Sequence, residues 1–141
     1  MTETSGAKEE QFFRERGFGL KIGFGERPAL MARAGQDFEE YRRWLEAAGV
    51  DTSLVKQIEG KFTASFFCST DVESNQIASF YTGGMANAGE LSFRTAADCK
   101  LATISPNDPG AMLQYAEECR ALRIPYIWDP EQQCARMSGA E

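Results

Sequence analysis

The sequence contains no histidine, and this absence removes several classes of active site at once. Serine–histidine–aspartate hydrolases, cysteine–histidine nucleophiles and histidine-containing zinc sites are all excluded. The four cysteines are scattered along the sequence, and no C-x-x-C pair occurs. In a cytosolic setting scattered thiols act as small apolar residues, so we expect buried structural cysteines and no disulfide or metal site. The residues concerned are Cys68, Cys99, Cys119 and Cys134.

The sequence also lacks a long hydrophobic run and an excess of positive charge. No apolar stretch approaches the roughly 20 residues of a membrane span, and residues 1–11 are polar, without the pattern of a signal peptide. The net charge is −6 and the isoelectric point is about 4.8, a balance that repels the phosphate backbone of nucleic acids. These absences predict a cytoplasmic protein with neither a membrane nor a nucleic acid as its partner.

With 141 residues, of which 43% are hydrophobic, the chain has the size of one domain with a packed core. Its clearest stretch is LATISPNDPGAMLQYAEECRALRIPYIWDP, residues 101–130, which predicts a strand, a helix and a second strand. Asp108 is a helix-capping residue and Pro109 suits the first helical position. Strands joined by such a helix lie parallel, and ligands bind beyond their carboxyl ends. The polar residues at those ends are Ser105, Asn107, Asp108 and Asp129.

A second strand–helix unit comes earlier in the chain. Residues 29–34 predict a strand that ends at a glycine. Asp37 is then expected to begin a helix and to form a capping box with Glu40. Apolar residues recur at helical spacing up to Gly49, which is expected just beyond the helix. Residues 55–58 are expected to form the next short strand.

Between the two units the pattern changes from helical spacing to alternation. Residues 62–69 and 76–81 alternate in the manner of strands around a polar turn, so residues 61–82 predict an antiparallel hairpin. A hairpin inserted above the carboxyl ends of a parallel sheet is well placed to act as a lid. Residues 85–98 are expected to be a loop with one helical turn after Ser92.

Glycine is frequent in residues 12–27, FFRERGFGLKIGFGER, which invites comparison with a phosphate-binding loop. No strand precedes this segment and no G-K-[ST] follows it, so the pattern favours a short helix broken by glycine. The polar residues 1–11 and 131–141 are expected to be tails.

Three segments together resemble the PfkB family of sugar and nucleoside kinases, also called ribokinase-like. They are ALMARAGQDFEEYRRWLEAAGVDTS, FTASFFCSTDVESNQIASFYTGGM and SPNDPGAMLQYAEECRALRIPYIWDP, and their order is more specific than any one of them. The resemblance is nearest to bacterial adenosine-kinase-type members. It implies an α/β, ribokinase-like parallel sheet with helices and an antiparallel β-hairpin lid, incomplete in this chain. The partial kinase domain would occupy residues 17–141, with residues 1–16 as a tail outside it.

The resemblance implies transfer of the γ-phosphoryl group of ATP, with Mg²⁺, to a hydroxymethyl group of a small-molecule sugar or nucleoside of the adenosine or ribose type. Phe66 and Phe80 match lid-strand positions that pack on the sugar or base. Asn107 matches a position at which some members hydrogen-bond substrate hydroxyls. The residues alone leave other roles open, because the phenylalanines also suit core or lid packing and Asn107 suits a turn before a helix. Asp37 matches the family's G-x-D, which helix capping explains equally.

Several parts of the family pattern have no counterpart in the sequence. The Gly-Gly-x-x-x-Asn segment expected just before Phe18 is replaced by other residues, and neither an N-x-x-E nor a Gly-Ala-Gly-Asp segment follows Pro130. The resemblance assigns magnesium ordering, the phosphate-binding helix and the catalytic base to the last two. No residue is therefore assigned as catalytic, metal-binding or cofactor-binding, and the sequence predicts an internal fragment that is inactive as it stands.

Two other interpretations stay open. The chain could be a non-catalytic binding or interaction module that uses the same half-fold, with its exposed hairpin strands pairing two copies into a homodimer. An unrelated flavodoxin-like regulatory domain is the least favoured, because it would have no hairpin between its strand–helix units.

Overall fold

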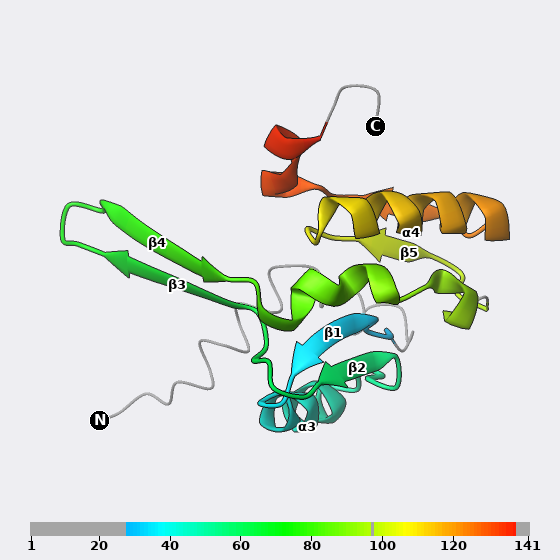
Figure 1. The fold of residues 1–141 in the computed structure, drawn as a ribbon, viewed down its shortest axis with the longest axis horizontal. Helices are drawn as coiled ribbons and strands as arrows, with labels where there is room; N and C mark the ends of the chain where they lie inside the picture. The colour runs from blue at the N-terminus through cyan, green and yellow to red at the C-terminus, as the bar shows by residue number, and fades with distance from the viewer. Residues whose placement is uncertain (1–27, 97, 138–141) are drawn as a thin grey trace.

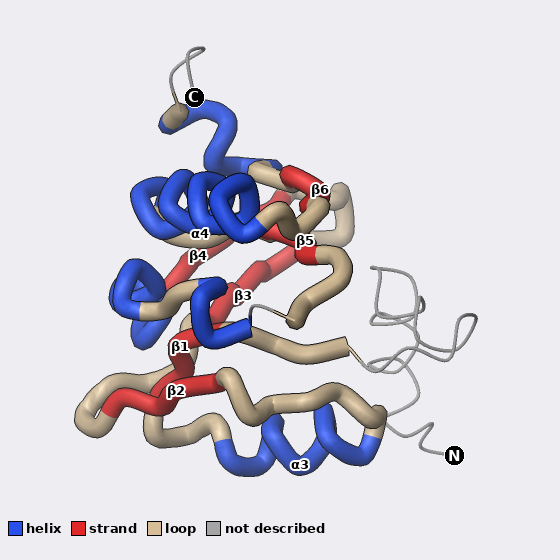
Figure 2. Tube along the Cα trace, turned by 90° about the vertical axis from the view of Figure 1, so that its right-hand side faces the viewer, coloured by secondary structure: helices blue, strands red, loops and turns tan. Residues whose placement is uncertain are grey.

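The computed structural model describes residues 28–96 and 98–137, and this part of the chain is an α/β structure with parallel strands, as the sequence predicts (Figure 1). The elements in chain order are β1 (Ala32–Gly35), α3 (Glu39–Ala47), β2 (Val55–Ile58), β3 (Ser65–Thr70), β4 (Gln76–Tyr81), η2 (Gly83–Glu90), η3 (Phe93–Ala96), β5 (Ala102–Ile104), α4 (Pro109–Leu122), β6 (Tyr126–Trp128) and η4 (Glu131–Arg136). Figure 2 shows α3 at one end next to β1 and β2, and α4 towards the other end next to β5 and β6.

The first unit consists of β1, α3 and β2, and its two strands pair in parallel along their full lengths. Phe38, Leu45 and Val55 are buried together and hold the helix against the strands. The chain leaves the helix at Gly49, whose φ of 79° is a left-handed conformation that a residue without a Cβ adopts at little cost. The predicted strand at residues 55–58 is confirmed.

The second unit consists of β5, α4 and β6, again with parallel strands. The carboxylate of Asp108 accepts a hydrogen bond from a backbone N–H in the first turn of α4 at 3.0 Å, and Pro109 is the first helical residue. Met112, Tyr115 and Cys119 form the buried face of the helix. The strand–helix–strand prediction for this stretch is confirmed, including its cap.

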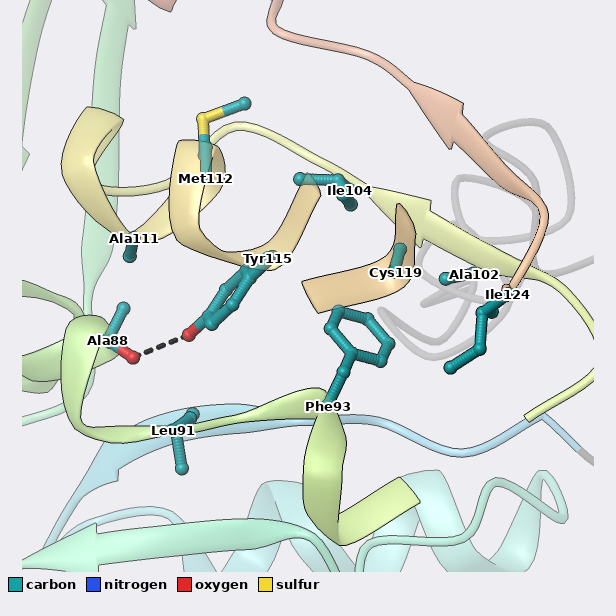
Figure 3. Close-up of a cluster of buried hydrophobic side chains, with 10 residues drawn as sticks. All are labelled: Ala88, Leu91, Phe93, Ala102, Ile104, Ala111, Met112, Tyr115, Cys119 and Ile124. Carbon is teal, nitrogen blue, oxygen red and sulfur yellow. Dashed lines mark hydrogen bonds between the residues drawn. The ribbon is translucent and has the colours of Figure 1, made fainter. Parts of the chain in front are cut away.

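The parallel strands form two separate pairs in the described residues, and no ladder joins β1 to β5. The 3₁₀ segment η2 instead contacts both β1 and α4. The predicted helical turn after Ser92 is confirmed as η3, but the loop predicted for the segment before it is wrong, because η2 occupies that position. Its run of small residues carries no apolar period. Tertiary contacts order it: the Tyr115 hydroxyl donates to the carbonyl of Ala88 at 2.5 Å (Figure 3).

The larger buried cluster joins α4 and β5 to both 3₁₀ segments. The rings of Phe93 and Tyr115 meet edge to face with centroids 5.7 Å apart. The carboxylate of Glu118 accepts hydrogen bonds from the Ser92 hydroxyl at 2.8 Å and the Phe93 N–H at 2.7 Å, which fixes the start of η3. The cluster, shown in Figure 3, contains Ala88, Leu91, Phe93, Ala102, Ile104, Ala111, Met112, Tyr115, Cys119 and Ile124.

Strands β3 and β4 form the predicted antiparallel hairpin, which projects away from the two units (Figure 1). Every residue from 66 to 82 is exposed. The prediction of buried cysteines is therefore wrong for Cys68 and also for Cys134 in η4, since no second layer covers either segment in the described chain. Cys119 is buried as predicted, and Cys99 is partly buried.

The predicted helix cap at Asp37 is wrong. Helix α3 begins at Glu39, Phe38 occupies the N-cap position, and no side chain caps the helix. The capping box between Asp37 and Glu40 does not form, because the Asp37 carboxylate accepts hydrogen bonds from Thr63 instead.

Two predictions concern the ends of the chain. The glycine-broken helix predicted over residues 12–27 lies outside the described residues. In the segment expected to be a polar tail, residues 131–136 form η4, which has no buried residue. Among the helices that the structure describes, none is long and apolar enough to cross a membrane.

The substitution Tyr115→Phe is expected to weaken the fold and to flatten its response to alkaline pH. Without the hydroxyl, the buried Ala88 carbonyl loses its donor, which costs on the order of 1–2 kcal/mol of unfolding free energy. Burial, with the nearby Glu118 carboxylate, raises the pKa of Tyr115 to about 12 from the usual 10.0. A pKa raised on folding means that this stabilisation is complete below about pH 10 and is lost as the pH rises towards 12.

Urea unfolding measured between pH 8 and pH 11 tests this expectation. Tyr126→Phe is the matched control, since it removes a hydroxyl from a partly buried tyrosine beside the same cluster. We expect its unfolding free energy to stay within about 0.5 kcal/mol of the unmodified chain. If the unfolding free energy falls by the same amount between pH 8 and pH 11 in the unmodified chain and in Tyr115→Phe, the hydrogen bond assigned to the Tyr115 hydroxyl is contradicted.

Candidate functional site

The candidate site lies where the hairpin joins the carboxyl end of β1. The arrows of β1 and β5 point towards the side from which the hairpin extends (Figure 1). Ligands of parallel α/β sheets bind beyond this edge. We call the backbone segments that meet there the hairpin root: residues 35–37, 60–63 and 83–84.

Backbone hydrogen bonds and close packing hold the hairpin root together. The N–H of Gln36 donates to the carbonyl of Lys61 at 2.8 Å, and the N–H of Gly84 donates to the carbonyl of Phe62 at 2.9 Å. A Cβ on Gly35 would lie 2.1 Å from the backbone carbonyl carbon of Phe62, so this crossing requires glycine. The outgoing and returning strands of the hairpin are thus both attached beside the end of β1.

One carboxylate adds side-chain hydrogen bonds to this crossing. Asp37 Oδ1 accepts from the Thr63 N–H at 2.7 Å and from the Thr63 hydroxyl at 2.8 Å. The same hydroxyl oxygen accepts from the Gly35 N–H at 3.0 Å. The hydrogen bond from the Thr63 hydroxyl and, to a smaller extent, the one from the Thr63 N–H lower the pKa of Asp37 because they favour the charged carboxylate.

A second polar network joins the root to β1 and η2. Lys61 Nζ donates to Asn87 Oδ1 at 2.6 Å, and Asn87 Nδ2 donates to Glu90 Oε1 at 2.6 Å. The other oxygen of Glu90 pairs with the guanidinium of Arg33. Opposite charges from three elements therefore meet on one side of the hairpin root.

Asn87 and Glu90 have the N-x-x-E spacing that the family resemblance links to magnesium, although they precede β5. Their oxygens are engaged by the cations Lys61 and Arg33, which would repel a metal ion. No group of three or more acidic, cysteine or histidine side chains gathers around a possible metal position in the described residues. The side chains of the described residues therefore do not form a site that fits a Mg²⁺ ion.

Phe66 and Phe80, the predicted lid residues, lie directly opposite each other in the antiparallel register, so their rings share one face of the hairpin. They are 64% and 53% exposed. Alternation along the strands places other side chains on the opposite face. We call the two surfaces the Phe66 face, with Phe66, Cys68, Ala78 and Phe80, and the Phe67 face, with Phe67, Ile77 and Tyr81.

Asn107, the third predicted site residue, lies after β5 and is partly buried. Its side-chain oxygen accepts from the N–H of Asp108 at 2.9 Å, and its own N–H contacts the sulfur of Met112 at 3.3 Å. None of the hydrogen bonds or ring contacts found in the described chain joins it to Phe66 or Phe80. The structure thus brings two of the three predicted site residues together.

The partner of Asp37 was not predictable from the sequence. Thr63 is 26 positions away, and a contact at that separation leaves no trace in local spacing. The network of Lys61 and Asn87 is equally distant in sequence. Two local patterns include Asp37: the capping-box spacing with Glu40, which predicts a helix cap, and the G-x-D of the family resemblance.

Known proteins resemble this chain in sequence and in structure. The model of the pfkB family of carbohydrate kinases matches residues 22–137. A nucleoside kinase of Methanothermobacter thermautotrophicus is 32% identical over 130 residues, which cover 87% of this chain and 40% of that protein. The structure of Burkholderia thailandensis nucleoside kinase in complex with inosine matches with a TM-score of 0.79 at 28% identity, over 87% of this chain and 41% of that one. Methanocaldococcus jannaschii nucleoside kinase, an archaeal member of the ribokinase family, matches with a TM-score of 0.74 at 26% identity. The match covers 86% of this chain and 40% of that one.

The chain spans about 40% of the length of the relatives it matches. The matched residues run through both strand–helix units, the hairpin and its root, so the likeness does not depend on a single motif. The fold agrees with it, since the neighbours in structure are ribokinase-type nucleoside kinases. The chain belongs to the pfkB family of carbohydrate kinases.

Proposed function

We propose that this chain carries the substrate-side half of a nucleoside kinase and binds a nucleoside of the adenosine type, without phosphorylating it on its own. The observation that carries the proposal is the aromatic pair on the Phe66 face. Two large rings, 64% and 53% exposed, lie side by side on a hairpin that leaves the ligand-binding edge of the parallel strands. Inosine is the ligand in the Burkholderia relative.

A nucleoside suits this surface on chemical grounds. A purine base offers two π-faces, and stacking of a base on an aromatic ring contributes about 1–3 kcal/mol. The ribose hydroxyls need hydrogen-bond partners, and Asn107 is the proposed one. Its oxygen is engaged by Asp108, which leaves the amide N–H₂ group to donate. In this proposal the hairpin closes over the base while the loop after β5 meets the sugar.

ATP and Mg²⁺ are the co-substrate and metal that the family resemblance implies. ATP would supply the γ-phosphoryl group and Mg²⁺ would neutralise its charge, for transfer to a hydroxymethyl group of the nucleoside or sugar. The 141 residues contain no Gly-Ala-Gly-Asp segment, which in the resemblance carries both the phosphate-binding helix and the base. We therefore propose that this chain alone does not catalyse the transfer. We also propose residues 17–141 as the family unit, and a cytoplasmic location.

Truncation of the aromatic pair is expected to weaken nucleoside binding. Phe66→Ala and Phe80→Ala should each raise the dissociation constant for inosine and adenosine roughly 5- to 100-fold, because each removes a stacking surface worth about 1–3 kcal/mol. Isothermal titration calorimetry with the full chain measures this change directly.

Phe67→Ala is the matched control for this experiment. Phe67 is 66% exposed, close to the value for Phe66, and lies one position along the strand on the opposite face. We expect its nucleoside affinity to equal that of the unmodified chain. Equal losses from the two faces, or no binding by the unmodified chain, would refute the proposed nucleoside site.

The absence of turnover is a separate expectation. In a coupled assay of ATP consumption, the chain with adenosine or ribose should show no rate above the blank, because positioning and charge stabilisation of the phosphoryl group require parts that its sequence lacks. Clear turnover by the purified chain would show that its own residues supply those parts.

The alternative function is an interaction module that pairs with a second copy through the hairpin. The sheet of β3 and β4 has two strands, so both outer edges lack a partner in the described chain. Neither strand contains a charged residue, and charges are the usual protection of an exposed edge. The strands of a second copy would meet these edges without repulsion between charged strand residues, although the turn carries Asp71 and Glu73 and the whole chain has a net charge of −6.

Light scattering coupled to size exclusion tests this alternative. We expect a dimer, and Ile77→Lys should convert it to a monomer because it places a charge on the Phe67 face. Val72→Lys in the turn, where the residue is fully exposed, is the control and should leave the dimer intact. A monomer of the unmodified chain at all accessible concentrations would exclude the pairing.

A further inference from the structure

The hairpin depends on its root for its direction. Residues 66–82 are exposed, and β3 and β4 make their extensive contacts with each other. Figure 1 shows them projecting from the two strand–helix units. The angle at which the hairpin leaves β1 therefore has to be set by contacts at the hairpin root.

The backbone of the root contains two positions at which the chain can turn. Gly60, on the outgoing side, has a φ of 75° and would have nothing within 4 Å of an added Cβ. Gly83, on the returning side, has a φ of 49° and packs against the crossing, since an added Cβ would lie 2.2 Å from the carbonyl oxygen of Phe62. The backbone hydrogen bonds of the crossing end at Phe62 and Gly84. The hairpin beyond them therefore needs a separate contact to hold it in one direction.

Asp37 provides that contact. It has no role in capping α3, and its Oδ1 accepts both the backbone N–H and the hydroxyl of Thr63. Thr63 lies two residues before β3 and its carbonyl accepts from the Ser65 hydroxyl at 3.1 Å, so the bond acts on the start of the strand. Hydrogen bonds to a carboxylate are about twice as strong as neutral ones.

We propose that Asp37 is the positioning residue of the hairpin: by binding Thr63, the first residue beyond the crossing, it fixes the direction in which the hairpin leaves the carboxyl end of β1. The restraint is a hydrogen-bonded side-chain contact, so it can open and close without disturbing the backbone crossing at Gly35. The proposal deepens the lid role given to the hairpin in the proposed function, and it predicts a physical property that is measurable without substrate.

Distance measurements between two nitroxide labels test the proposal in the full chain. One label is placed on the exposed Cys68 of β3, and the other on α4 through Glu117→Cys, in a background with Cys99→Ser and Cys134→Ser. Cys119 is fully buried and is left unchanged. With Asp37 present we expect one narrow distance distribution in electron double resonance. Asp37→Ala should replace this single peak with a broad distribution.

Variants at Thr63 distinguish a positioning role from general loss of structure. Thr63→Ser keeps both donors and should retain the narrow peak, whereas Thr63→Val keeps only the N–H and should broaden it. Glu39→Ala is the matched control, because that carboxylate pairs only with Arg42 and Arg43 of its own helix in the ion pairs found. A narrow peak in Asp37→Ala would overturn the proposal. If Asp37→Ala fails to fold by circular dichroism, identical distributions for the serine and valine variants would overturn it instead.

Inosine titrations of the unlabelled chain and of its unlabelled Asp37 and Thr63 variants separate this proposal from the function on which it rests. If no variant binds inosine but the distributions change as expected, the nucleoside site is refuted and the positioning role of Asp37 stands. If the unmodified chain binds inosine and the distributions do not respond to Asp37, the positioning role is refuted alone.

Discussion

The crossing of residues 35–37 and 60–63 is the constraint on which the rest of the arrangement depends. Gly35 ends β1, and its lack of a Cβ lets the backbone of Phe62 pass at van der Waals contact. The position of the hairpin depends on this crossing. The outgoing strand is attached to it through Lys61 and Thr63, and the returning chain is attached through the hydrogen bond from Gly84 to Phe62. A small residue at the end of one strand thus determines where a hairpin of two strands can lie.

The second half of the molecule is attached by a different kind of contact. The segment η2 follows the hairpin directly and is held between β1 and α4, where the Tyr115 hydroxyl binds its Ala88 carbonyl. Glu118 of the same helix secures the start of η3. Helix α4 therefore supports the returning end of the hairpin root as well as covering β5. The two strand–helix units are linked through this segment, since their ladders do not meet in the described residues.

Much of this architecture was predictable because its determinants are local. The cap at Asp108, the proline after it and the apolar period of α4 lie within one stretch, as do the alternating strands of the hairpin. The predictions that were wrong concern residues whose surroundings come from elsewhere. Asp37 has the local features of a cap but meets Thr63, 26 residues away, and Cys68 has the neighbours of a buried strand but no layer beneath it. The exposure of Phe66 and Phe80 was not predictable either, because apolar residues alternate along a strand in the same way whether or not another layer covers that face.

The antiparallel register has a consequence for how such a hairpin changes over time. Even-numbered positions of β3 and β4 share one surface and odd-numbered positions share the other, so substitutions can alter the two surfaces independently. Insertion or deletion is different, because a shift of one residue exchanges the two surfaces completely. Length in this segment is therefore far more restricted than side-chain identity.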